Sequence, residues 1–182
     1  MNAYRSNKDQ TFAKYYQWIG ILVVCLLSVP LHFVYVWTGE NTVAGLFTPI
    51  NESIWEHLKL VYWPLLIWWI VGYLIYRNKK DLSLSRWLTA AAVSILISMT
   101  FIVSWYYVWT EAFDIHSSIL DVGSLFVAVP ISQLVAIHVY KFIQPRRVYL
   151  LLSALMLTAL AVLFFWFTFY SPDMPLFIPP SG

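Results

Sequence analysis

Five long apolar stretches dominate this chain of 182 residues and leave little sequence between them. Each is long enough to cross the hydrocarbon core of a bilayer as a helix, which takes roughly 20 residues. Only 11% of the residues are charged and the mean hydropathy is +0.70, whereas soluble domains have about 25% charged residues. The sequence therefore predicts an all-α integral membrane protein with five transmembrane helices, over residues 18–37, 58–76, 87–109, 119–140 and 149–170.

The basic residues lie in alternate connections between these stretches. All but one of the eleven Lys and Arg residues precede the first stretch, separate the second from the third, or separate the fourth from the fifth. Because Lys and Arg are enriched in cytoplasmic loops, this pattern predicts a cytoplasmic N-terminus and an outer C-terminus. We therefore expect a basic interfacial segment over 1–17, one transmembrane domain over 18–170 and a Pro-rich outer tail over 171–182. The expected partner is the lipid bilayer and not nucleic acid.

The densest group of ionisable residues, 51–59, directly precedes the second stretch. Ser53 followed by Glu56 fits a capping box, in which the serine oxygen accepts from the Glu56 N–H and the Glu56 carboxylate returns to the Ser53 N–H. A helix is therefore expected to begin here, with Ser53 and Glu56 as its cap. The same segment also suits the binding of a cation or the relay of a proton, through Glu52, Glu56 and His57. For Glu56 both interpretations stand.

Further polar side chains occur within the apolar stretches. His32 lies near the outer end of the first stretch, where an imidazole is costly unless it has partners. Asp121 begins a polar line in the fourth stretch, continued by Ser124 and Ser132; it caps this helix or belongs to a site. Prolines bend helices, so we expect a cavity between the three stretches that contain one. These are the first, second and fourth, with Pro30, Pro64 and Pro130.

Together these positions form a predicted outward-facing cluster of Glu, His and Asp side chains. The candidates for binding a ligand or relaying a proton are His32, Glu52, Glu56, His57 and Asp121. A divalent metal such as zinc is expected to be held by imidazole and carboxylate groups, with Glu52 or Glu56 acting as a base toward a bound water. The candidate metal ligands are His32, His57, His116 and Asp121. The single cysteine, Cys25, excludes an intramolecular disulfide.

Several strings in the sequence are similar to those of a known family. They are His32-Phe33-x-Tyr35-x-Trp37-x-Gly39, Gly45-Leu46-Phe47, Asn51-Glu52-Ser53-x-Trp55-Glu56-His57-Leu58-Lys59 and Phe167-Thr168-Phe169-Tyr170. Together they resemble a family of small bacterial multi-pass membrane proteins of unknown function. The resemblance implies a bacterial cytoplasmic membrane and lends no activity. The family tends to have Pro-Pro-His after its last helix, where this chain has Ser171-Pro172-Asp173 and therefore no tail histidine.

Three functions remain open at this point. The first is binding or transport of a cation or small polar ligand by the outer cluster. The second is a structural or accessory membrane protein, in which the polar side chains are caps and packing contacts. The third is a membrane-embedded metal-dependent hydrolase, although the compact motifs His-Glu-x-x-His and Gly-x-Ser-x-Gly are absent from the sequence. We rank them in this order, so a role other than an enzyme is favoured.

Overall fold

The computed structural model describes residues 2–78 and 82–179, and these residues form helices and no strand. Five long helices account for most of the chain: α1 (Asn2–Trp37), α4 (Lys59–Tyr76), α5 (Leu84–Tyr107), α6 (Ser118–Phe142) and α7 (Arg147–Phe169). The short elements are α2 (Thr42–Phe47), α3 (Ile54–His57), the π-helix Val108–Ala112 and the 3-10 helix Pro175–Phe177.

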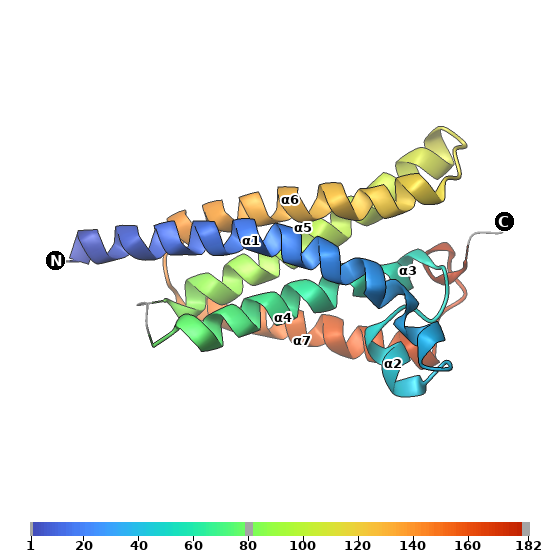
Figure 1. The fold of residues 1–182 in the computed structure, drawn as a ribbon, viewed down its shortest axis with the longest axis horizontal. Coiled ribbons are helices and arrows are strands. Elements are labelled where there is room, and N and C mark those ends of the chain that lie inside the picture. Colours follow the sequence, from blue (N-terminus) through green and yellow to red (C-terminus); the bar gives the residue numbers. More distant parts are fainter. Residues whose placement is uncertain (1, 79–81, 180–182) are drawn as a thin grey trace.

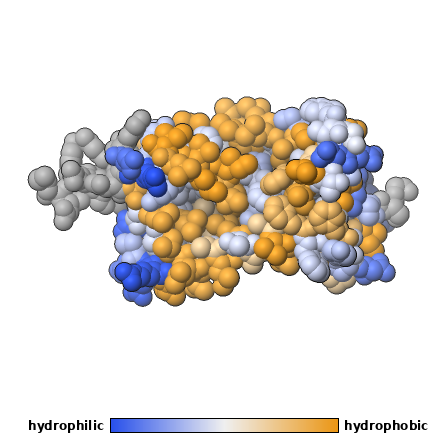
Figure 2. Space-filling model, turned by 90° about the horizontal axis from the view of Figure 1, so that it is seen from below, coloured by the Kyte–Doolittle hydropathy of each residue, from blue (hydrophilic) through white to orange (hydrophobic). Residues whose placement is uncertain are grey.

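The five long apolar helices predicted from the sequence are confirmed, and each is long and apolar enough to cross a membrane. They cover Thr11–Trp37, Ile54–Tyr76, Leu84–Ala112, Ile119–Phe142 and Arg147–Phe169. On the face shown in Figure 2, apolar side chains cover the middle of the bundle and hydrophilic ones gather at its two ends. An apolar middle with hydrophilic ends is the surface expected of a bundle whose middle lies in the hydrocarbon core of a bilayer.

The first of these helices begins earlier than predicted. Residues 11–17, expected in the membrane interface, continue α1 into the bundle, where Ala13, Tyr16 and Gln17 are buried. The Tyr16 ring stacks on Trp68 of α4 with centroids 4.3 Å apart, and its hydroxyl donates to the Trp68 carbonyl oxygen at 2.8 Å. The aromatic side chains of this segment therefore serve helix packing.

Helix α5 is central, because it packs against α4, α6 and α7, while α1 packs against α4 and α6. Small residues on α5 allow this close approach: Ala90, Ala91, Ser94 and Ser98 are fully buried. Figure 1 shows the N-terminus and the α4–α5 and α6–α7 connections at one end of the bundle, and α2, α3 and the C-terminus at the other. Which of these ends faces the cytoplasm stays a prediction.

The tail after α7 is folded against the bundle. Pro175–Phe177 forms a 3-10 helix, and Phe177 is buried with its ring 5.0 Å from the rings of both Trp55 and Phe167. The prolines exclude an α-helix in this tail, as its composition predicted, yet its apolar side chains still contribute to the core. The tail thus covers the end of the bundle at which residues 51–57 lie.

Candidate metal site

Ser53 begins the short helix α3, as the sequence predicted, but the reciprocal half of the capping box is different. The Ser53 hydroxyl accepts from the Glu56 N–H at 3.4 Å, whereas the Ser53 N–H donates to the side chain of Asn51 at 2.9 Å. The Glu56 carboxylate accepts instead from the Ile50 N–H at 3.0 Å. Asn51 therefore takes the position expected for Glu56, and this leaves the Glu56 carboxylate available for another partner.

That partner is Lys59, which is fully buried although it carries a charge. Its Nζ donates to Glu56 Oε2 at 2.6 Å, to the Gly45 carbonyl oxygen at 2.8 Å and to Thr168 Oγ1 at 2.7 Å. An ammonium group has three donors, so every one of them is used. The ion pair fastens α2 and α7 to the start of α4. Glu56, which the sequence suggested as a ligand, is therefore paired with Lys59 and has a structural role.

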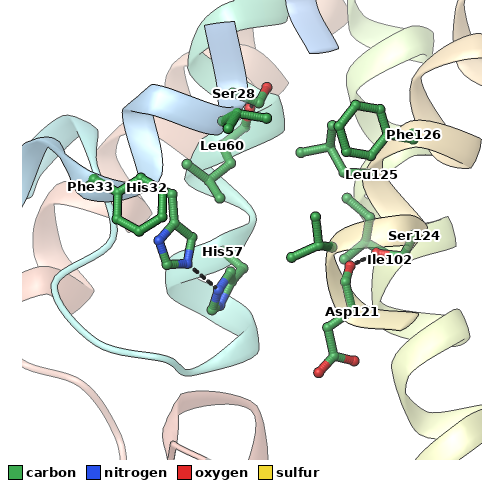
Figure 3. A pocket seen from close by; sticks show the side chains of 12 residues that line it. Ser28, His32, Phe33, His57, Leu60, Ile102, Asp121, Ser124, Leu125 and Phe126 are labelled. Carbon is green, nitrogen blue, oxygen red and sulfur yellow. Dashed lines mark hydrogen bonds between the residues drawn. The ribbon is translucent and has the colours of Figure 1, made fainter. Parts of the chain in front are cut away.

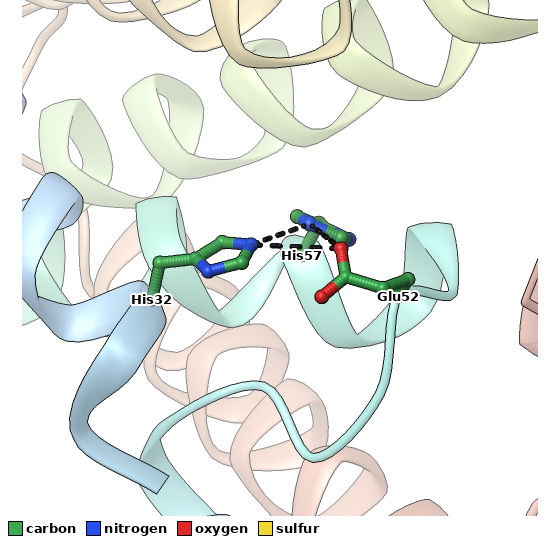
Figure 4. A group of neighbouring side chains, drawn as sticks. All are labelled: His32, Glu52 and His57. Atoms are coloured by element: carbon green, nitrogen blue, oxygen red, sulfur yellow. Dashed lines mark hydrogen bonds and ion pairs between the residues drawn. The ribbon is translucent and has the colours of Figure 1, made fainter. Parts of the chain in front are cut away.

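Three other side chains converge beside this pair (Figure 4). His32 comes from α1, His57 from the end of α3, and Glu52 from the loop before α3. The two imidazole Nε2 atoms lie 3.1 Å apart. Glu52 Oε2 lies 3.3 Å from the Nε2 atom of His57 and 3.6 Å from that of His32. We refer to His32, Glu52 and His57 as the His/Glu/His group.

The hydrogen bond on the far side of the His57 ring decides which nitrogen faces the group. Its Nδ1 lies 2.9 Å from the Ser53 carbonyl oxygen, which can only accept, so Nδ1 carries a proton. In the neutral imidazole the Nε2 lone pair then points toward Glu52 and His32. A backbone carbonyl in this role is the usual outer partner of a metal-binding histidine, because it holds the ring and selects its tautomer.

The carboxylate of the group is favoured in its ionised form. When His57 carries a second proton, on Nε2, this N–H donates to Glu52 and lowers the pKa of the Glu52 carboxyl, although the partial burial of Glu52 acts in the opposite direction. The Glu52 side chain remains 67% exposed, whereas those of His32 and His57 are 24% and 22% exposed. The group therefore combines two sheltered imidazoles with an anionic oxygen that solvent reaches.

These distances match the spacing of metal ligands. Zinc bonds of about 2.0–2.1 Å in a tetrahedron place neighbouring ligand atoms roughly 3.3 Å apart. The three separations in the group are 3.1, 3.3 and 3.6 Å, so the three atoms fit one face of such a tetrahedron. Among the described residues this group has the composition and spacing needed to hold a metal ion. With these three protein ligands, a tetrahedral ion would have its fourth position left for water or another ligand.

A cavity of about 180 Å³ adjoins the two histidines. It lies between α1, α4 and α6, as the sequence predicted, and Ile102 of α5 also lines it. Figure 3 shows His32 and His57 on one side of this space and Asp121 of α6 on the other. Ser28 and Ser124 line it too, but their hydroxyls lie 2.7 Å from the Leu60 carbonyl oxygen and 2.6 Å from that of Asp121. The polar groups that face the cavity are therefore the two imidazoles and the Asp121 carboxylate.

The remaining candidates are placed apart from the His/Glu/His group. Asp121, expected as a metal ligand or helix cap, faces the cavity, and the described residues give its carboxylate no hydrogen-bond partner. His116 lies in an exposed loop, 3.7 Å from Asp114. Of the four metal ligands predicted from sequence, the structure thus brings together His32 and His57. It adds Glu52, which we had expected to bind a cation, relay a proton or act as a base.

Two buried polar side chains were missed in the sequence. Gln17 of α1 and Gln133 of α6 are 1% and 0% exposed, and their amide atoms have no hydrogen-bond partner among the described residues. Gln133 lies inside an apolar stretch, which is itself a signal, because an amide in lipid is costly unless it is satisfied. Gln17 directly precedes the first predicted stretch and gave no such signal. Both lie in the bundle interior, away from the residues that line the cavity.

The fold and the group together define a class: a small all-helical protein with five helices able to cross a membrane and a His/Glu/His group near one end of the bundle. The chain belongs to a family of unknown function, DUF6512, whose family model matches residues 5–180. The resemblance to a family of unknown function is thereby confirmed over nearly the whole chain, while its bacterial origin stays a prediction. No curated protein and no solved structure matches the chain.

Proposed function

We propose that this protein binds a divalent transition metal, with zinc as the best fit, through His32, Glu52 and His57. The observation that carries the proposal is the spacing of the three ligand atoms, 3.1, 3.3 and 3.6 Å. Two imidazole nitrogens and one carboxylate oxygen suit zinc and its neighbours in the first transition row. This is the cation-binding role that ranked first from sequence, now assigned to a smaller set of residues.

The role of the ion follows from the number of its ligands. Structural zinc sites have four protein ligands, whereas catalytic sites have three and keep one position for water or substrate. A set of three ligands beside a cavity therefore favours an ion that exchanges its fourth ligand. The predicted topology puts this position at the outer face of a bacterial cytoplasmic membrane.

Metal-dependent hydrolysis is a second candidate, favoured by Asp121. Asp121 lines the cavity on the side opposite the two histidines, and its carboxylate has no hydrogen-bond partner among the described residues. A carboxylate in this place can accept the proton that a metal-bound water loses as it attacks a substrate. Glu52, which the sequence suggested for this task, is then a ligand of the metal.

The test is metal binding by the purified protein in detergent, after stripping with a chelator. We expect about one zinc ion per chain, bound more weakly at low pH because imidazoles must be neutral to bind a metal. The variants His32→Ala and His57→Ala should lose at least about a hundredfold in affinity. His116→Ala is the matched control and should bind zinc as the wild type does.

Two results contradict the proposal. The first is a folded, stripped protein with no affinity for zinc, manganese or nickel. The second is a loss of zinc in His116→Ala equal to that in His57→Ala. If zinc does bind, it should also raise the unfolding temperature of the wild type, because a ligand at a hundred times its Kd stabilises the folded state by about 2.7 kcal/mol.

A further inference from the structure

The cavity beside the His/Glu/His group has one polar end and otherwise apolar walls. The polar end consists of His32, His57 and Asp121. Apart from Ser28 and Ser124, whose hydroxyls bond to backbone carbonyls, the other lining side chains are aliphatic or aromatic. They are Val29, Phe33, Leu60, Ile102, Val122, Leu125 and Phe126. A small polar ligand finds hydrogen-bonding groups only at one end of this space.

The apolar part of the cavity reaches the outer surface of the bundle between α1 and α6. Four of its lining residues are also exposed there: Val29 and Phe33 of α1, at 47% each, and Val122 and Phe126 of α6, at 52% and 44%. Each pair is four residues apart, so each lies along one face of its helix. All four fall within helices able to cross a membrane. The opening therefore faces lipid, and the polar end lies toward the loop that contains Glu52.

This arrangement has the polarity of a lipid molecule. A lipid has an apolar chain that lies in the membrane and a polar head that lies at its surface. In the same way the cavity runs from a lipid-facing opening to the two imidazoles and the Asp121 carboxylate. Ligand pockets are mostly apolar and have a few polar groups that fix the orientation of the ligand. Here these polar groups lie at one end, and Leu60, Ile102 and Leu125 form the buried wall.

We propose, building on the metal site described above, that the cavity binds one acyl chain of a membrane lipid, which enters sideways between α1 and α6. The head of that lipid then lies at the His/Glu/His group, where one of its oxygen atoms takes the open position on the metal. Asp121 lies on the opposite side of the head. The ligand of this site is therefore a lipid of the surrounding membrane, and it is also the substrate if the site is hydrolytic.

The test uses a lysophosphatidylcholine that carries a photoreactive diazirine in its acyl chain, with the protein in lipid nanodiscs. We expect cross-links to concentrate on the residues that line the cavity. The variant Val122→Trp places an indole at the opening and should reduce this labelling at least about tenfold, by filling the space. Val122 is 52% exposed, so the larger side chain has room and the fold is retained.

The matched control is Leu155→Trp on α7, a lipid-facing position that is 68% exposed and remote from the cavity. It should leave the labelling unchanged. Labelling spread evenly over α7 and the cavity helices, or equal labelling in wild type and Val122→Trp, overturns the inference. A second opening variant, Val29→Trp, repeats the test from the α1 side.

Zinc content measured on the same samples separates this inference from the metal site. Zinc bound without labelling of the cavity overturns acyl-chain binding and leaves the metal site intact. Labelling of the cavity in a protein with no affinity for zinc overturns the metal site and supports binding of the chain. His57→Ala should lose zinc yet keep its cross-links, because His57 contacts the head of the lipid and not its chain.

Discussion

Replacing Lys59 by methionine tests whether the buried ion pair holds together the end of the bundle that contains α2 and α3. Lys59 and Glu56 have side chains that are 0% and 4% exposed and are joined at 2.6 Å. Removing one partner of a buried pair costs about 3–5 kcal/mol, because the other charge stays buried without compensation. Lys59→Met also takes away a donor from the Gly45 carbonyl oxygen and from Thr168. We therefore expect a loss of about 3–5 kcal/mol in the free energy of unfolding.

The double variant Glu56→Gln/Lys59→Met isolates the effect of charge. It leaves no buried charge, and the new amide can still accept from the Ile50 N–H. We expect the double variant to be more stable than Lys59→Met alone, by about 2 kcal/mol, within the usual range of coupling energies between contacting residues. Ser53→Ala is a reference for the loss of a simple helix cap, which costs about 1 kcal/mol.

The assay is equilibrium unfolding by sodium dodecyl sulfate in mixed micelles, followed through the fluorescence of the ten tryptophans. A double-mutant cycle then gives the coupling between Glu56 and Lys59. If Lys59→Met costs no more than Ser53→Ala, or if the double variant is no more stable than Lys59→Met, the assigned role of the pair is wrong. Zinc affinity should survive in both variants, since neither residue belongs to the His/Glu/His group.

Three further predictions concern the loop, the helix packing and the topology. In the metal-free protein at acid pH, protonated His57 donates from Nε2 to Glu52, and this lowers the pKa of Glu52 below its ordinary value of 4.5. The ionised form of Glu52 therefore stabilises the protein above that value, and this contribution is lost as the pH falls through the lowered pKa. Glu52→Gln should therefore flatten the acid side of a plot of unfolding temperature against pH, and an unchanged slope contradicts the hydrogen bond. A Cβ atom at Gly72 comes within 2.5 Å of the Tyr16 ring, whereas a Cβ atom at Gly123 meets nothing within 4 Å. In thermal unfolding we expect Gly72→Ala to destabilise the protein by about 1–3 kcal/mol and Gly123→Ala to stabilise it by up to about 1 kcal/mol. Equal effects of the two substitutions contradict the packing of Tyr16 against Gly72. For topology, single cysteines placed at Ser83, Ser117 and Ser171 in a Cys25→Ala background should react with an impermeant thiol reagent on intact cells at the last two positions; labelling at Ser83 alone reverses the predicted orientation.

Much of the fold was readable from the sequence, because the signals are local. A helix that crosses a membrane needs a continuous apolar stretch of sufficient length, and all five stretches have it. Ser53 begins a helix because its hydroxyl accepts from the N–H of a residue three positions later, which is an interaction between near neighbours in the sequence. The same local reasoning missed that residues 11–17 join the first helix, since Tyr16 is held there by Trp68 of α4.

The candidate site was identified from the sequence in part and from the tertiary structure in part. The sequence by itself determined which groups lie near the ends of the helices, and it selected Glu52, Glu56 and His57 within one short segment. It did not separate Glu56 from Glu52, because their partners come from elsewhere in the chain: α2 and α7 contact the Glu56–Lys59 pair, and α1 brings His32 to Glu52. Only the tertiary structure decided that one carboxylate fastens helices while the other faces two imidazoles, since the packing of distant helices determines which charged groups meet.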